Sequence, residues 1–146
     1  MKETTEKLKN YMCLMESYFV GAKEEEILLK QSKNKWSKKE VLGHLIDSGI
    51  HNLIRFTEVQ FASGPYEIRK YDQEELVLAN DYQNAYLLEM LGFWLSINKR
   101  ILRLMENQTE ESLRFEIIVD DEYNNLEFLM KDYVLHMKHH INQITQ

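Results

Sequence analysis

The stretch W-S-K-K-E-V-L-G-H-L-I-D, residues 36–47, contains the best-defined helix start in the sequence. Ser37 and Glu40 have the spacing of a capping box: the serine hydroxyl can accept from the glutamate backbone N–H, and the glutamate carboxylate can accept from the serine backbone N–H. Trp36 and Val41, on either side of this box, can form a hydrophobic staple. We therefore predict a long helix that begins directly after Ser37.

Hydrophobic periodicity predicts three further helices. In each of them apolar residues recur at intervals of three and four, which places them on one helical face. Two of the helix starts carry sequences typical of capping boxes, N-D-Y-Q at residues 80–83 and N-N-L-E at residues 124–127. Four amphipathic helices of this length indicate an all-α fold, a four-helix bundle. The predicted helices cover roughly residues 3–31, 38–61, 80–105 and 124 to nearly the C-terminus.

Two longer connections affect how these helices are arranged. Residues 62–80 contain the Gly64-Pro65 pair and show no sustained period. This length permits a crossover, so the helices on either side need not be antiparallel neighbours. In the connection over residues 106–124, apolar and other residues alternate from Leu113 to Val119, which favours a short strand or β-hairpin before the last helix. Two short strands would leave the fold class unchanged.

Composition and charge narrow the classes of partner. The chain has 146 residues, which suits a single domain over residues 1–146, and its 18 basic and 24 acidic side chains give a net charge of −6. We expect no nucleic-acid partner, because a phosphate-binding surface needs clustered Lys and Arg. No apolar run is long enough to span a bilayer, and residues 1–10 lack the apolar core of a signal peptide. We therefore expect no membrane association and a cytoplasmic location.

The single cysteine limits the chemistry of any metal site. Cys13 cannot form an intrachain disulfide, and a cysteine-based zinc site is excluded. It lies between Met12 and Leu14 in an apolar-periodic stretch, so we expect a packed or partly buried thiol. The five histidines are the next candidates for metal ligands.

Three of these histidines lie in the last predicted helix. His136 and His140 are four residues apart, so their side chains lie one above the other on the same side of the helix. His140 falls within the apolar stripe, His136 lies on its flank, and His139 points outward. Two inward imidazoles one turn apart can bind one ion, each at about 2.0–2.1 Å. The pair alone does not decide between a metal site and buried histidines that form hydrogen bonds within the core.

The second helix offers a third histidine. His44 and His51 share a helical face with Asp47, and His51 lies two turns further along than His44. Asp47 can accept a hydrogen bond from an imidazole, as carboxylates beside metal-bound histidines commonly do. An equally good interpretation is that Asp47 pairs with His51 or Arg55 on a more hydrated surface. The spacing leaves these choices open.

Three motifs together resemble one known family. Residues 36–47 are similar to the second-helix signature of the DinB-like superfamily of small bacterial four-helix-bundle proteins. Y-D-Q at residues 71–73 and D-Y-V-L-H-M-K-H-H-I-N-Q-I at residues 132–144 resemble its later landmarks, in the same order and over essentially the whole chain. The resemblance implies an up-down-down-up bundle with a three-histidine metal site. The residues that match the family's metal ligands are His44, His136 and His140, whereas His51 and His139 match none.

The chemistry of such a site follows from its ligands. Three neutral imidazoles leave the full charge of a divalent ion uncompensated, and Zn²⁺ would keep a fourth position open for water or substrate. Ni²⁺ also suits imidazole. The ion could lower the pKa of a bound water toward about 7 for hydrolysis, or bind a low-molecular-weight thiol as its thiolate. Asp47 and Tyr133 are candidates for a general acid or base by position alone.

The resemblance implies two kinds of enzyme. The superfamily includes metal-dependent hydrolases and enzymes that use thiols such as bacillithiol or mycothiol for S-transfer or isomerisation. We favour thiol transfer to a small-molecule substrate, and the resemblance also implies a possible homodimer. One alternative is a stress-response bundle that holds a metal or a small ligand without turnover. Another is a purely structural bundle with hydrogen-bonded core histidines.

Overall fold

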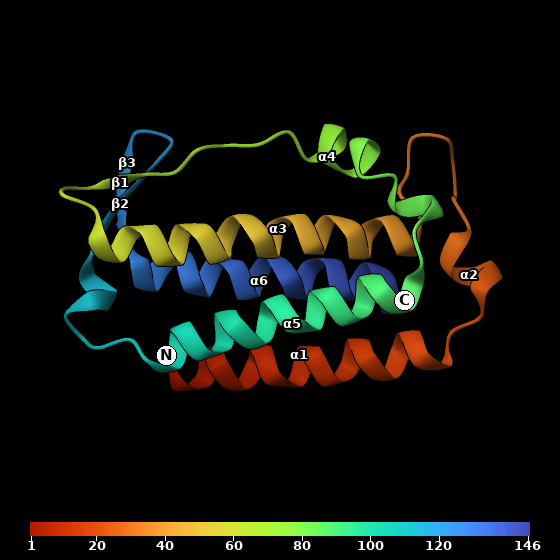
Figure 1. Ribbon diagram of the computed structural model, residues 1–146, viewed down its shortest axis with the longest axis horizontal. Coiled ribbons are helices and arrows are strands. Elements are labelled where there is room, and N and C mark those ends of the chain that lie inside the picture. Colours follow the sequence, from red (N-terminus) through yellow and green to blue (C-terminus); the bar gives the residue numbers. More distant parts are fainter.

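Four long helices lie side by side along the long axis of the molecule in the computed structural model, which describes residues 1–146 (Figure 1). α1 and α6 run in one direction and α3 and α5 run in the other (Figure 1). The predicted all-α four-helix bundle and the up-down-down-up order implied by the family resemblance are therefore confirmed. The bounds of these helices are Lys2–Gly21 for α1, Lys38–Glu58 for α3, Leu87–Glu106 for α5 and Leu126–Thr145 for α6.

α3 is the most enclosed of the four helices at its N-terminal half. Every residue from Lys39 to Gly49 is buried, since α5 and α6 pack on one side and the connection that carries α4 (Gln73–Ala79) crosses the other (Figure 1). Gly49 permits a close approach to α5: a Cβ atom at this position would lie 2.9 Å from Cγ2 of Ile97. This enclosure buries polar side chains of α3, among them His44 and Asp47.

The predicted capping box forms at the start of α3. The Ser37 hydroxyl accepts from the Glu40 backbone N–H at 3.1 Å, and the Glu40 carboxylate accepts from the Ser37 N–H at 2.8 Å. Lys30 donates to the other Glu40 oxygen at 2.7 Å. The helix continues to Glu58 and is followed by a short 3-10 turn over Val59–Phe61, in agreement with the predicted end near residue 61.

The first helix is shorter than predicted. α1 ends at Gly21 rather than near residue 31, because Ala22 adopts an extended conformation with φ −76° and ψ 146°. A separate short helix, α2 (Glu24–Leu28), follows. Twenty helical residues already span about 30 Å, the length of α5 and α6. The break lets Ile27 enter the core, where only 2% of its surface stays exposed.

The third long helix begins later than predicted. N-D-Y-Q at residues 80–83 does not cap it: Asp81 has a left-handed φ of 50°, a 3-10 turn follows over Tyr82–Asn84, and α5 starts only at Leu87. The polar side chains of this motif are engaged elsewhere, since Asn84 donates to Asp81, and Asn80 donates to a carboxylate of α3. The local sequence therefore resembles a capping box, but its polar groups form other contacts in the folded chain.

The predicted hairpin before the last helix is present. β2 (Glu116–Val119) pairs antiparallel with β3 (Glu122–Asn125) through a two-residue turn, and β1 (Tyr66–Glu67), which was not predicted, pairs parallel with β2. α6 is capped one residue later than N-N-L-E suggests: the Asn125 side chain accepts from the Phe128 N–H, while Asn124 remains within β3, opposite Ile117.

The remaining expectations concern exposure. Cys13 is exposed, so the prediction of a packed or partly buried thiol is wrong: Met12 and Met15 face the core, and Cys13 lies on the opposite side of α1. None of the helices combines the length and the apolar character that crossing a membrane would require.

Candidate metal centre

Three imidazoles from two antiparallel helices meet at one end of the bundle. The Nε2 atom of His136 on α6 lies 3.2 Å from Nε2 of His44 on α3 and 3.1 Å from Nε2 of His140, one turn further along α6. All three histidines offer ligand atoms within 4.8 Å of one another. The convergence of His44, His136 and His140 expected from the sequence is thus present in the structure.

The surroundings of the cluster hold the rings in place. His44 is fully buried and its ring lies beside the Trp36 indole, with 5.0 Å between the ring centroids. His136 and His140 are partly exposed. The Gln143 amide faces two histidines: its oxygen lies 2.9 Å from Nδ1 of His140, and its nitrogen lies 3.1 Å from Nε2 of His139. Sequence reasoning assigned no role to Gln143, although it stands one turn after His139.

Burial keeps the three imidazoles neutral. Loss of hydration lowers the pKa of His44 to about 3 and the pKa of His136 to about 4, and the neighbouring histidines add to both shifts. Burial also lowers the pKa of His140, although its hydrogen bond to Gln143 opposes this shift. At neutral pH each ring therefore keeps one nitrogen lone pair, which is the form that binds metal.

The hydrogen bonding of the cluster is incomplete without an ion. Because Gln143 presents its oxygen, His140 carries its proton on Nδ1, and its Nε2 is an acceptor. His136 Nε2 touches two other Nε2 atoms, but one proton cannot lie on a straight line to both. Tetrahedral ligands at about 2.0–2.1 Å from an ion stand about 3.3–3.4 Å apart, close to the two observed nitrogen–nitrogen distances. The residues present therefore fit a divalent ion.

Asp47 forms neither of the hydrogen-bonded pairs predicted for it. Its Oδ1 accepts from the Tyr82 hydroxyl at 2.7 Å and from the Asn80 amide at 3.1 Å, and neither His51 nor Arg55 pairs with it. Its buried Oδ2 has no hydrogen-bond partner, and neither does Nδ1 of His44. Burial raises the pKa of this carboxyl group. Asp47 thus anchors the connection that covers α3.

The other two histidines lie outside the cluster. The ring of His51 stacks on Tyr71, with 4.0 Å between centroids and 9° between planes. His139 is exposed, as predicted, and it contacts Gln143. The structure therefore selects His44 over His51, because residue 51 is seven positions and about 10 Å further along α3.

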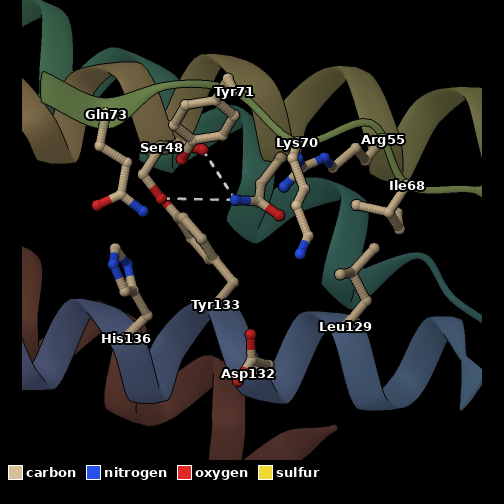
Figure 2. A pocket seen from close by; sticks show the side chains of 11 residues that line it. Ser48, Arg55, Ile68, Lys70, Tyr71, Gln73, Leu129, Asp132, Tyr133 and His136 are labelled. Atoms are coloured by element: carbon tan, nitrogen blue, oxygen red, sulfur yellow. Dashed lines mark hydrogen bonds between the residues drawn. The ribbon is translucent and has the colours of Figure 1, made fainter. Parts of the chain in front are cut away.

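A cavity of about 310 Å³ adjoins the cluster at His136 (Figure 2). α3 contributes polar side chains that sequence reasoning missed, although Ser48, Asn52 and Arg55 follow His44 at helical spacing. The Y-D-Q motif is divided: Tyr71 and Gln73 line the cavity, whereas Asp72 caps α4 by accepting from the Glu75 N–H. The cavity is lined by Ser48, Asn52, Arg55, Ile68, Lys70, Tyr71, Gln73, Leu129, Asp132, Tyr133 and His136.

Tyr133 has a structural role in this wall. Its hydroxyl donates to Oδ1 of Asn98 at 2.7 Å, and both residues are buried. Burial raises the pKa of Tyr133 far above its usual range. A hydroxyl that is hydrogen-bonded within the core is not available as a general acid. These contacts therefore do not support the role of general acid or base that the sequence suggested for Tyr133.

One solved structure shares this fold over almost the whole chain. YfiT from Bacillus subtilis, described as a probable metal-dependent hydrolase with an unusual four-helix bundle topology, matches with a TM-score of 0.87 and 23% identity, over 99% of this chain and 83% of YfiT. No family model and no curated protein matches the chain. The likeness shows that the two chains share a fold.

Proposed function

We propose that this chain is a DinB-like metalloenzyme that binds one divalent ion, Zn²⁺ or Ni²⁺, through His44, His136 and His140. The observation that carries the proposal is the pair of Nε2 contacts to His136, which one proton cannot satisfy and one ion can. A bound ion would supply a Lewis acid and a bound water or thiol of lowered pKa. The ligand set is neutral, so the positive charge of the ion would stay available to the substrate.

The cavity beside His136 supports a small-molecule substrate. Ser48, Asn52 and Gln73 line the cavity with hydrogen-bonding groups. The ring of Tyr71 closes one side of it (Figure 2). Burial raises the pKa of Tyr71, so its hydroxyl keeps its proton and can donate to a substrate oxygen. These groups would bind and orient a substrate whose reacting atom lies toward the histidines.

We now favour hydrolysis over the thiol transfer that the sequence led us to expect. The structural likeness to YfiT, itself described as a probable metal-dependent hydrolase, supports this choice. Transfer of a low-molecular-weight thiol of the bacillithiol type is the second candidate, because three neutral imidazoles leave the net positive charge that would stabilise a thiolate. A bundle that holds metal without turnover is the remaining alternative.

Metal content is the first test. Protein without an affinity tag is stripped with a chelator, reloaded with Zn²⁺ or Ni²⁺ and desalted, and the bound metal is then measured. We expect about one ion per chain in the parent protein and in His139→Ala and His51→Ala, and a loss of that ion in His44→Ala and His140→Ala. Less than about 0.1 ion per chain in the parent protein would contradict the proposal.

Turnover is the second test. The reloaded protein is assayed against a panel of small esters and amides, and separately against electrophiles with bacillithiol as cosubstrate. Activity that is lost in His140→Ala and kept in His139→Ala would support an enzyme, and the active panel would decide between hydrolysis and thiol transfer. Stoichiometric metal without activity in either panel would favour the non-catalytic binder.

A further inference from the structure

Arg55 stands at the far end of the cavity from the candidate metal centre. It follows His44 by eleven residues on α3, which brings it back to nearly the same helical face about 16 Å further along the axis. Figure 2 shows His136 at one end of the cavity and Arg55 toward the other, with Tyr71 and Ser48 between them. A molecule that fills the cavity would therefore touch both ends.

The charge of Arg55 has no acidic partner in the structure. Its one hydrogen bond is donated from Nη2 to the backbone carbonyl of Arg69, at 2.6 Å, and no carboxylate lies within ion-pair distance. A guanidinium has five N–H donors arranged as a planar fork, so several donors remain free. Partial burial lowers the pKa of Arg55, although the group remains charged, and no anion offsets this cost.

An aromatic stack holds this side chain in position. The Tyr71 ring contacts both His51 and Arg55: the guanidinium carbon lies 5.4 Å from its centroid, and the His51 ring stacks on it with 4.0 Å between centroids. A cation over an aromatic face is attracted to it without losing its hydrogen-bond donors. The stack thus orients Arg55 and leaves its fork free, and it gives His51 a role that does not involve metal.

The other charges of the cavity do not replace Arg55. The Lys70 ammonium is largely exposed and forms an ion pair with Asp120. Asp132 lies on the opposite wall, on α6, between Leu129 and Tyr133 (Figure 2). Arg55 is therefore the one cationic side chain of the cavity without a carboxylate partner.

We propose that Arg55 is a substrate-binding residue for a carboxylate, so that the ligand of this cavity is a small organic acid whose reacting group points toward His136. A carboxylate matches the fork because it can accept two parallel N–H bonds from one guanidinium. The placement of the reacting group rests on the proposed function, whereas recognition of the carboxylate does not need the metal. The carboxylate-binding role of Arg55 and the metal-dependent reaction can therefore be disproved independently of each other.

The test compares two ligands of nearly equal shape, hexanoate and the neutral hexanamide, titrated into the chelator-stripped protein by calorimetry. We expect hexanoate to bind at least about tenfold more tightly than hexanamide, as a charge-assisted bidentate contact warrants. The same titration with His140→Ala, which cannot hold the ion, should keep this preference. Equal binding of the two ligands, or no binding of either, would overturn the proposal whatever the metal content of the parent protein.

Three variants assign the preference to Arg55. Arg55→Gln should lose the preference for hexanoate while it still binds one metal ion per chain. Arg55→Lys, which keeps the charge but not the planar fork of donors, should bind hexanoate several-fold more weakly than the parent protein. This variant keeps the test valid if Arg55→Gln folds poorly. Lys70→Gln is the matched control and should leave the preference unchanged. A preference that survives in both Arg55 variants would place the carboxylate elsewhere.

Discussion

The ring of Tyr82 occupies the space where any residue other than glycine at position 43 would place its Cβ atom. A Cβ built on Gly43 would lie 2.1 Å from Cδ2 and 2.8 Å from Cβ of Tyr82, so the whole side chain would have to move. Tyr82 also donates to Asp47, and this contact fastens the long connection over the buried half of α3. The absence of a side chain at Gly43, directly before His44, therefore lets Tyr82 pack on α3 and hold the long connection over the candidate site.

Gly43→Ala is expected to destabilise the protein. Overpacking costs about 1–3 kcal/mol, and the displaced Tyr82 would also leave Asp47 without its hydroxyl partner, which together exceed the gain of about 1 kcal/mol in helix propensity. Gly92→Ala is the matched control, because nothing lies within 4 Å of a Cβ at this position of α5. Urea unfolding should show opposite signs for the two variants, and stabilisation by Gly43→Ala would contradict the close approach.

Tyr133→Phe is expected to lower the free energy of unfolding by about 1–3 kcal/mol, because it leaves the buried Oδ1 of Asn98 without its donor. Tyr123→Phe removes a hydroxyl from a tyrosine that is 67% exposed in β3, and it should change stability by less than about 0.5 kcal/mol. Chemical denaturation of both variants compares them directly. Equal stabilities would show that the Tyr133–Asn98 bond contributes nothing.

Acid is expected to destabilise the metal-free protein. The pKa of His44 is about 3 and that of His136 about 4 in the folded chain, whereas both return to about 6.5 on unfolding. Below pH 6.5 the unfolded chain binds more protons than the folded one, so stability falls as the pH drops from about 6.5 toward 4. Each histidine contributes a slope of up to about 1.4 kcal/mol per pH unit.

Urea unfolding of the stripped protein between pH 7.5 and 5 measures this slope. The stability of His44→Gln should depend less on pH than that of the parent protein, because this variant lacks one of the histidines whose pKa is lowered in the folded chain. His139→Gln should match the parent protein, since this histidine is exposed. The same pH dependence in all three proteins would show that the buried histidines do not cause it.

Metal should stabilise the folded chain by mass action. At a free Zn²⁺ concentration one hundred times the Kd, binding to the folded state alone adds about 2.7 kcal/mol. The thermal midpoint of the parent protein and of His139→Ala should therefore rise with added Zn²⁺ and fall again with chelator. His140→Ala should show no such rise, and an equal rise in this variant would place the ion at another site.

The sequence allowed the helices with strong local signals to be predicted well, and it failed where tertiary contacts overrode such signals. The Ser37–Glu40 capping box is closed within four residues, so its groups find each other regardless of the rest of the chain. The end of α1 depends on Ile27 reaching a core that is built by other helices, and hydrophobic periodicity alone cannot predict such a contact. The predicted cytoplasmic location, homodimer and absence of a nucleic-acid partner stay predictions.

By itself, the sequence determined the pairing of His136 with His140, because residues four apart on a helix share a face wherever that helix lies. Only the tertiary structure decided that His44 completes the cluster, since this depends on the antiparallel packing of α3 on α6 and on the height at which the two helices meet. The same holds for Arg55, whose role follows from the segment after residue 66 that folds back across α3 and closes the cavity. Side-chain spacing is a local property, whereas the distance between helices is set by the whole core.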